Sequence, residues 1–314
     1  MTSRQGITVI TDDGVERVLR NPPKSAATRV QSWGRVTVMV LLAAFFMFPL
    51  VFMAFSSLKP DQQLLRDTNS LRAFAPVGDL SLDNYRGVFD RVPATRFIIN
   101  SLVISFITVG LGLFVNSLAG FSLSRMRWRG QKVAMTVIIA TLIVPFETIA
   151  VPLLLVVNHL PWISISDGIK VETGWLNSYH VQILPFVANA FSIFLFAQFF
   201  KTIPRELDEA ARVDGASWFY IYRKLIVPLS GPVFATVAIL TFLPIWNQYL
   251  WPLMVTQDED IRPVMVGLQY FFQLNIEWGE IMAYCTMITV PILVLFLALQ
   301  RVYIRSIAQT GVKG

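Results

Sequence analysis

The chain has 314 residues, of which 54% are hydrophobic and 15% are charged, and its mean hydropathy is +0.58. That much apolar surface exceeds what one soluble core buries, so the composition excludes a soluble domain and indicates a membrane protein. A single cysteine, Cys285, excludes an intrachain disulfide framework, and His159 and His180 lack metal-ligand spacing. The net charge of +6 reflects basic residues concentrated in certain loops, not a surface for nucleic acid.

Six apolar segments are long enough to cross a bilayer core of about 30 Å as helices. Of the 26 Lys and Arg residues, 18 fall in the tail, the second and fourth loops and the C-terminal end, and 8 fall in the other loops. Basic residues concentrate in the cytoplasm, so this asymmetry places both termini there. The predicted spans are 36–55, 100–122, 133–156, 181–200, 230–254 and 283–303.

The predicted organisation is a polar cytoplasmic arm over 1–35 and a transmembrane domain over 36–314. The first span has no small-residue cleavage pattern after its long polar tail, so we interpret it as an uncleaved helix. The expected fold class is therefore an all-α integral membrane protein with six transmembrane helices.

In the third span, Glu147 is the only one of the 20 acidic residues inside a predicted membrane segment. At 1.5 Å per residue it lies about 21 Å from the inner end of its helix, in the outer half of the bilayer. A carboxylate at that depth is a candidate for a polar path, because burying it unpaired is costly. A structural carboxyl that faces another helix is an equal alternative. Pro145 and Pro152 each remove a backbone donor and are expected to bend this helix.

Between the fourth and fifth spans lies a short charged segment, Pro204-Arg-Glu-Leu-Asp-Glu-Ala-Ala-Arg-Val-Asp-Gly-Ala-Ser217. Its early proline, early acidic residues and late Gly215 predict a helix over 204–214. One narrow face of this helix carries Leu207, Ala210, Ala211 and Asp214, and its two alanines would let another protein approach closely. The alternative is a solvated loop on which Asp208 and Arg212 form a surface ion pair.

The outer end of the fifth span reads Trp246-Asn-Gln-Tyr-Leu-Trp-Pro252. Aromatic rings stack on sugar faces and amides bond to hydroxyls, so Trp246, Asn247, Gln248 and Tyr249 suit a carbohydrate path. An outer aromatic belt explains Tyr249 and Trp251 equally well, and it is favoured for each residue taken alone.

The segment 204–229 resembles the EAA loop of ATP-binding cassette importer permeases, in Glu209-Ala210-Ala211, Asp214-Gly215-Ala216 and Pro228-Leu229. Most of the chain after residue 36 resembles the maltose second-subunit branch of that family. Further matching motifs are Ser57-Leu-Lys59, Asp83-Asn-Tyr85, Asn100-Ser-Leu102, Trp246-Asn247 and the C-terminal Gly311-Val-Lys-Gly314. The connection 161–178 is longer than is usual in the family.

The resemblance implies a permease subunit of an ATP-driven importer for a sugar or oligosaccharide in the bacterial inner membrane, and not an enzyme. It implies three kinds of partner: a second permease subunit, two ATPase subunits and an extracytoplasmic substrate-binding protein. It also implies a helix that couples to the ATPase, with contacts at Glu206, Leu207, Glu209, Ala210, Ala211, Asp214 and Gly215. ATP and Mg would bind to the partner ATPases, and no cofactor is expected on this chain.

Three alternatives remain to be weighed against an importer permease. A membrane enzyme would need a nucleophile–base pair or metal ligands at membrane depth, and only Glu147 is there. A secondary transporter would want several intramembrane ionisable groups and internal repeats, which the sequence does not display. A glycerol-phosphate permease is nearer, but a phosphate ligand favours a cation and no Lys or Arg lies in a span core. The chain has no Gly-x-x-x-x-Gly-Lys-Ser/Thr motif, so ATP hydrolysis must come from partner chains.

Overall fold

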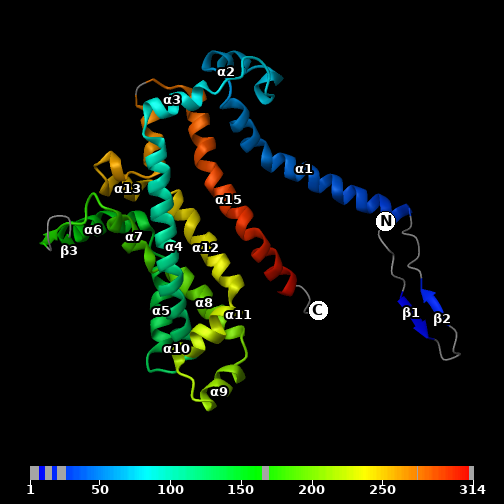
Figure 1. Cartoon of the computed structure of the whole chain (residues 1–314), viewed down its shortest axis with the longest axis vertical. Helices are drawn as coiled ribbons and strands as arrows, with labels where there is room; N and C mark the ends of the chain where they lie inside the picture. Colours follow the sequence, from blue (N-terminus) through cyan, green and yellow to red (C-terminus); the bar gives the residue numbers. More distant parts are fainter. Residues whose placement is uncertain (1–6, 11–15, 20–25, 165–169, 274, 311–314) are drawn as a thin grey trace. The chain divides into compact units, whose positions relative to one another are not determined.

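The structure is a computed structural model that describes residues 7–10, 16–19, 26–164, 170–273 and 275–310. The chain divides into two units, 1–52 and 53–314. The first unit carries the antiparallel strands β1 (Ile7–Ile10) and β2 (Glu16–Leu19) and most of helix α1 (Ala26–Ser56). The second unit carries the remaining elements, which are mostly helical (Figure 1).

The helices of the second unit follow in chain order. They are α2 (Asp61–Asp67), α3 (Asp83–Arg91), α4 (Ala94–Arg125), α5 (Gln131–Thr141), α6 (Phe146–His159), α7 (Tyr179–Val187), α8 (Ala190–Thr202), α9 (Glu206–Val213), α10 (Trp218–Ile221), α11 (Val227–Leu229), α12 (Gly231–Trp246), α13 (Leu250–Val255), α14 (Val264–Leu268) and α15 (Trp278–Thr310). Short 3-10 turns lie at η1 (Leu71–Phe74), η3 (Glu259–Ile261) and η4 (Gln269–Phe272), and the π-helical turn η2 (Tyr222–Ile226) joins α10 to α11.

Among the described residues, three helical segments are individually long and apolar enough to cross a membrane: Trp33–Ser56, Ala94–Arg125 and Trp278–Ala298. Three helix pairs pass the same test together, but each pair is bent. The bend is 102° between α5 and α6, 41° between α7 and α8, and 81° between Trp218–Leu229 and α12. Counting each pair as one span gives up to six, the number that the sequence predicts.

The fifth predicted span is wrong at its outer end. The sequence predicts one helix over 230–254, but α12 ends at Trp246 and a separate helix, α13, begins at Leu250. Trp246 therefore closes one helix instead of continuing it, and the amide-rich residues 247–249 form the connection. The third predicted span is broken where proline led us to expect a bend, because α6 begins directly after Pro145.

One face of α4 is made of small and polar side chains that pack against α7 and α8. A Cβ added to Gly120 would lie 2.6 Å from the Phe196 Cβ atom, so only glycine permits this approach of α4 to α8. Close contacts between small residues drive helix association in membranes, where burial from water is not available as a force.

Asn116 on α4 satisfies the backbone at the bend between α7 and α8. Its Nδ2 donates to the Val187 carbonyl at 2.9 Å, and its Oδ1 accepts from the Asn189 N–H at 2.9 Å. A break inside a membrane span leaves such groups without helix partners, and a neighbouring side chain must supply the bonds. The bend of α7–α8 is therefore built into α4.

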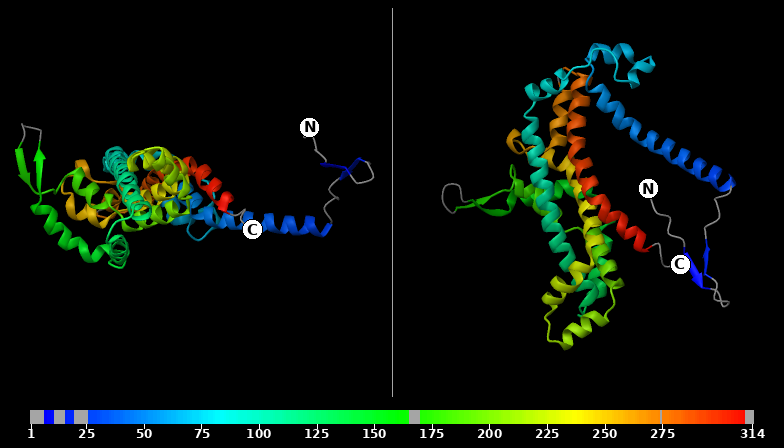
Figure 2. Two further views of the ribbon diagram at one scale, coloured as in Figure 1. Left: turned by 90° about the horizontal axis from the view of Figure 1, so that it is seen from below. Right: turned by 45° about the vertical axis from the view of Figure 1, so that its right-hand side comes forward.

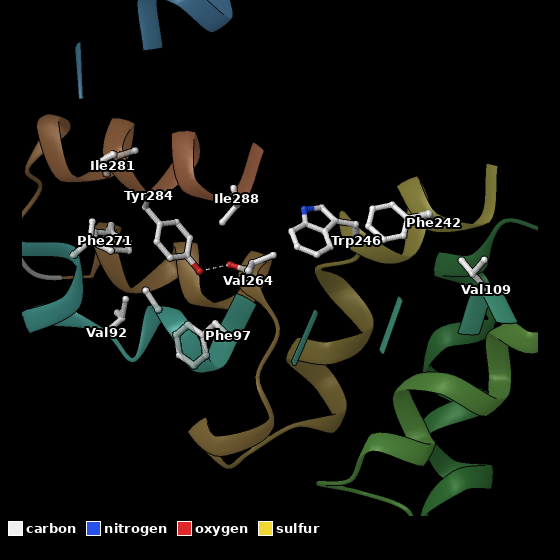
Figure 3. Close-up of a cluster of buried hydrophobic side chains, with 13 residues drawn as sticks. Val92, Phe97, Val109, Phe242, Trp246, Val264, Phe271, Ile281, Tyr284 and Ile288 are labelled. Atoms are coloured by element: carbon white, nitrogen blue, oxygen red, sulfur yellow. Dashed lines mark hydrogen bonds between the residues drawn. The ribbon is translucent and has the colours of Figure 1, made fainter. Parts of the chain in front are cut away.

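A buried apolar cluster joins α3, α4, α12, α14 and α15 (Figure 3). Tyr284 on α15 crosses this cluster and donates its hydroxyl hydrogen bond to the Val264 carbonyl at 2.8 Å. A Cβ on Gly267 would lie 2.4 Å from both the Phe97 ring and the Tyr284 hydroxyl, so this position in the cluster has no room for a side chain. The cluster fixes the 264–268 segment to the ends of α4 and α15.

Polar side chains of the loop 56–93 form contacts within the loop and with α15. The Lys59 side chain is fully buried and its Nζ donates to the Arg72 carbonyl at 2.6 Å. Asp61 accepts from the N–H groups of Trp278 and Gly279, at 3.0 and 2.6 Å, and so caps the start of α15 from a distant part of the chain. Arg91 Nη1 donates to Glu280 Oε2 at 2.7 Å. These contacts attach the loop to α15.

The long connection 161–178 contains an antiparallel hairpin of β3 (Pro161–Ser164) and β4 (Lys170–Thr173). In both views of Figure 2 these strands project away from the helices. The His180 ring lies between two tryptophans, stacked on Trp162 at 4.6 Å and edge-on to Trp175 at 5.2 Å. The extra length noted in the sequence is thus a hairpin whose base packs on the start of α7.

Candidate functional site

The candidate site is the segment Pro204 to Leu229, which carries α9, α10, η2 and α11. The sequence predicts a helix over 204–214, and α9 spans Glu206–Val213. Three acidic residues occupy its first turn, where the partial positive charge of the helix end favours them: Glu206, Asp208 and Glu209. Figure 1 shows α9 at one extremity of the second unit, with α3 at the other.

Gly215 ends α9 in a left-handed conformation with φ of +82°. Its N–H donates to the Arg212 carbonyl at 3.1 Å, and the Ala216 N–H donates to the Ala211 carbonyl at 2.9 Å. This pair of bonds is a Schellman cap, which satisfies carbonyls that the helix end leaves open. A Cβ at Gly215 would meet nothing within 4 Å, so backbone strain alone restricts the position. The cap fixes the direction in which the chain leaves α9.

The inner face of α9 is held by a buried ion pair. Arg125 at the end of α4 donates from Nη1 to Asp208 Oδ2 at 3.0 Å, and the two side chains are 1% and 8% exposed. The alternative surface pair of Asp208 with Arg212 is therefore wrong. Arg212 instead donates to the Ala216 carbonyl at 2.9 Å and lies over the Trp218 ring at 5.3 Å.

Burial dominates the electrostatics of Asp208. Loss of water raises the pKa of this carboxyl, and the neighbouring Arg125 opposes the rise without cancelling it. Within the described residues, Asp208 Oδ1 and Arg125 Nε have no hydrogen-bond partner. The pair is thus buried and incompletely satisfied, an arrangement that gives little net stability.

The outer face of α9 mixes acidic, small and apolar side chains. Of the seven residues assigned to a coupling surface by resemblance, Ala211 lies on the inner side, where it packs on the buried cluster around Phe200 and Ile221. The other six are exposed: Glu206, Leu207, Glu209, Ala210, Asp214 and Gly215. The predicted shared face of Leu207, Ala210, Ala211 and Asp214 is therefore divided between the two sides of the helix.

The sequence reading missed two features of this segment. Val213 is 87% exposed and lies beside the exposed residues Arg212 and Asp214 at the end of α9. Tyr222 follows the exposed Phe219 and Tyr220 closely in the chain, but it is buried, and its hydroxyl lies 2.7 Å from Ser117 Oγ on α4. Phe219 and Tyr220 are 59% and 54% exposed, as expected of residues near a membrane surface.

The five substrate-path candidates differ in burial. Glu147 is exposed in the first turn of α6, directly after the bend, where its charge complements the helix end. Trp246 is 1% exposed and stacks on Phe242 at 5.5 Å, so it belongs to the core in Figure 3. Asn247 is exposed and its Nδ2 donates back to the Leu243 carbonyl at 2.9 Å.

Gln248 and Tyr249 complete this connection; the first is partly buried and the second is 39% exposed. The belt explanation is wrong for Trp251, which is fully buried and donates its ring N–H to the Val181 carbonyl at 2.9 Å. A hollow of about 720 Å³ lies elsewhere, beside the start of α4, and none of the five candidates lines it. Its lining includes Phe89, Arg96, Asn100, Tyr179 and Asp260.

Known proteins are similar to most of this chain. The family model of the binding-protein-dependent transport system inner membrane component matches residues 109–309, which include all of the candidate site. The chain belongs to this family. The match thus spans α4 from its middle onward, all three bent pairs and α15 up to residue 309.

Relatives of this permease are similar over most of their length. The arabinooligosaccharides transport system permease protein AraQ of Halalkalibacterium halodurans is 30% identical over 293 residues, covering 93% of this chain and 100% of that protein. The lactose transport system permease protein LacG of Rhizobium radiobacter is 30% identical, covering 86% and 92%. The sn-glycerol-3-phosphate transport system permease protein UgpE of Salmonella typhi is 31% identical, covering 87% and 95%.

A solved structure supports the fold of this permease. A chain of a bacterial ABC transporter involved in the import of the acidic polysaccharide alginate superposes with a TM-score of 0.71, covering 90% of this chain and 99% of that one. Its sequence identity is 22%, so the likeness establishes a shared fold. The permease is therefore a multi-pass protein of the bacterial inner membrane.

Proposed function

We propose that this chain is a permease subunit of an ATP-driven importer, and that its substrate is a sugar or oligosaccharide. The observation that carries the proposal is α9, a rigidly capped helix at one extremity of the second unit with an exposed acidic and small-residue face. Two relatives similar over most of the chain are named for arabino-oligosaccharides and lactose, which supports the substrate class.

Coupling to an ATPase would occur through the exposed side of α9. Glu206, Leu207, Glu209, Ala210 and Asp214 form the proposed contact, and Val213 extends it. Ala211 and Gly215 act indirectly, the first by seating the helix and the second by capping it. Closure of two ATPase subunits around ATP would displace α9 and alternate the access of the pore between the two faces of the membrane. ATP and Mg would be bound by those subunits.

The remaining partners are a second permease subunit and an extracytoplasmic substrate-binding protein. We propose cytoplasmic termini, from the 18 basic residues on one side against 8 on the other. Single cysteines at Asp83 and Ser217, in a Cys285→Ala background, test this topology because both positions are exposed. The Asp83 position should react with an impermeant thiol reagent in intact cells, and the Ser217 position should react only after permeabilisation. Labelling of both in intact cells contradicts the topology.

A glycerol-phosphate importer is the second candidate, because UgpE is as similar in sequence as the sugar permeases. A phosphate needs charge-assisted donors along its path, whereas the candidate residues Glu147, Asn247, Gln248 and Tyr249 supply an anion, two amides and a phenol. That set suits a neutral polyol better. The two substrates are separated by the uptake assay below.

The proposed function is tested by purifying the complex through a tag on this chain and reconstituting it with the copurifying proteins. We expect an ATPase in the complex and ATP-dependent uptake of an oligosaccharide but not of glycerol 3-phosphate. Glu209→Lys should lower both ATPase association and uptake, since it reverses charge on the proposed contact.

Asp83→Lys is the matched control for ATPase association, because it makes the same charge change in the first turn of α3 at the other extremity of the unit. Absence of any ATPase from the wild-type complex would contradict the proposed function as a whole. An unchanged ATPase association in Glu209→Lys would contradict the α9 contact.

A further inference from the structure

Arg125 ends α4 inside a cage of acceptors that all belong to α8, α9 or the turn between them. Its Nη1 donates to Asp208 on α9, and its Nη2 donates to the carbonyls of Phe200 and Ile203, the latter at 2.6 Å. One guanidinium thus joins three pieces of the chain: the end of α4, the end of α8 and the inner face of α9.

These contacts need the geometry of arginine. The three acceptors lie around two terminal nitrogens, and a planar guanidinium reaches them together, whereas a lysine ammonium is a single point that cannot. Buried ion pairs contribute little net stability, because removing both charges from water offsets their attraction. Asp208 Oδ1 and Arg125 Nε also lack partners among the described residues. The arrangement is therefore better suited to fixing the position of α9 than to stabilising the fold.

α4 also carries contacts at its opposite end. Asn100 Nδ2 donates to the carbonyls of Asp260 and Arg262, both at 2.9 Å, and Ser101 Oγ accepts from the Val264 N–H at 2.9 Å. Between these contacts and Arg125 the helix is unbroken. A rigid helix with fixed attachments at both ends transmits a displacement along its length, unlike the three bent pairs.

We propose that Arg125 is a positioning residue that makes α9 move as one body with the ends of α4 and α8, so that a displacement of α9 reaches the 260–264 segment at the other end of α4. This inference rests on the proposed function, because the displacement would come from the ATPase. Without the guanidinium, α9 stays attached through the chain and the Ala211 contact, but its tilt relative to α4 is no longer fixed.

Transport coupling is the first test, with Arg125→Lys in the reconstituted complex. We expect normal amounts of complex and continuing ATP hydrolysis, with sugar transported per ATP reduced about tenfold, within the range by which single residues change coupling between sites. Arg127→Lys is the matched control, since Arg127 is exposed and lies two residues further along the same chain segment. A wild-type ratio of uptake to hydrolysis in Arg125→Lys overturns the proposal.

A distance measurement tests the positioning itself, without any ATPase. Spin labels at Val213→Cys on α9 and Lys201→Cys on α8, both exposed, are introduced in a Cys285→Ala background. We expect a narrow distance distribution in the parent and in Arg127→Lys, and a broad one in Arg125→Lys. If the wild type proves not to bind an ATPase, the proposed function fails while this measurement still reports on Arg125.

Asp208→Asn is the second variant, since it removes the charge but leaves an acceptor for the guanidinium. We expect the distance distribution between the two spin labels to broaden, but less than in Arg125→Lys. If Arg125→Lys and Asp208→Asn both keep a narrow distribution, or if neither variant assembles, Arg125 is a folding residue and the positioning role is overturned.

Discussion

α4 and the α5–α6 pair have the same kind of sequence and different structures. Both were predicted as apolar spans, at 100–122 and 133–156, yet α4 is one helix of 32 residues while α5 and α6 meet at 102°. Apolar content therefore predicts that a segment lies in the membrane but not that it is straight. The difference comes from what each helix packs against and from where proline falls.

α4 contains no proline, and 39% of its most apolar stretch of 18 residues is buried inside the second unit. In contrast, α5 has no buried residue, and the connection to α6 ends in Pro145. Proline lacks an N–H and disfavours a helical conformation at the residue before it, here Val144. Although α5 touches α4 and α8, none of its side chains is buried, so these contacts do not force α5 and α6 into line.

The largest effect that tests this comparison is expected at Gly120. Gly120→Ala should lower the stability of the protein by about 1–3 kcal/mol, because the new methyl group would lie 2.6 Å from Phe196 Cβ in the α4–α8 contact. Gly110→Ala on the same helix is the control, since its added Cβ would meet nothing within 4 Å. Thermal unfolding in detergent measures both variants. Equal midpoints would show that α4 is not held by this contact.

A smaller effect is expected at Asn116, which tests whether α4 maintains the bend of α7–α8. Asn116→Ala leaves the Val187 carbonyl and the Asn189 N–H without their bonds, which should cost about 1–2 kcal/mol. Thr136→Ala is the control, because that exposed hydroxyl bonds only within its own helix, to the Lys132 carbonyl. Thermal unfolding again measures the difference. A loss no greater than that of Thr136→Ala would contradict the role of Asn116.

At Gly215, unlike at Gly120, the backbone conformation and not packing disfavours a larger residue. Gly215→Ala should cost about 1 kcal/mol through strain at a positive φ, although its Cβ would have open space. Gly231→Ala is the matched control, because that position has open space and no positive φ. Since Gly215 also sets the direction in which the chain leaves α9, uptake per ATP should fall in Gly215→Ala alone. Identical uptake ratios in the two variants would remove the cap from the coupling step.

Local patterns of apolar residues, acidic first turns and a terminal glycine predicted three straight spans and the bounds of α9 to within two residues, whereas the other three predicted spans correspond to bent pairs. The site was predicted less well where long-range contacts decide it. Asp208 was paired with Arg212 at the helical spacing of four, but its partner Arg125 lies 83 residues away on α4. Trp246 looked like a path residue because its neighbours are amides, whereas its ring stacks on Phe242 within the buried core. Burial of this kind is set by helices that no local pattern brings together.

The smallest effect on stability is expected at Glu147 and Asn247, which follow breaks and are exposed. Glu147→Gln removes a charge at the start of α6 and should cost about 0.3–1 kcal/mol, and Asn247→Ala removes one bond within its own helix end. If these side chains line the path, the apparent affinity for sugar should fall while the amount of complex stays constant, because the substrate loses a hydrogen-bonding partner and the fold does not. Uptake kinetics normalised to complex in the membrane separate the two effects. Unchanged affinity and maximal rate in both variants would assign Glu147 to the helix end and Asn247 to the cap of α12, and would remove both residues from the path.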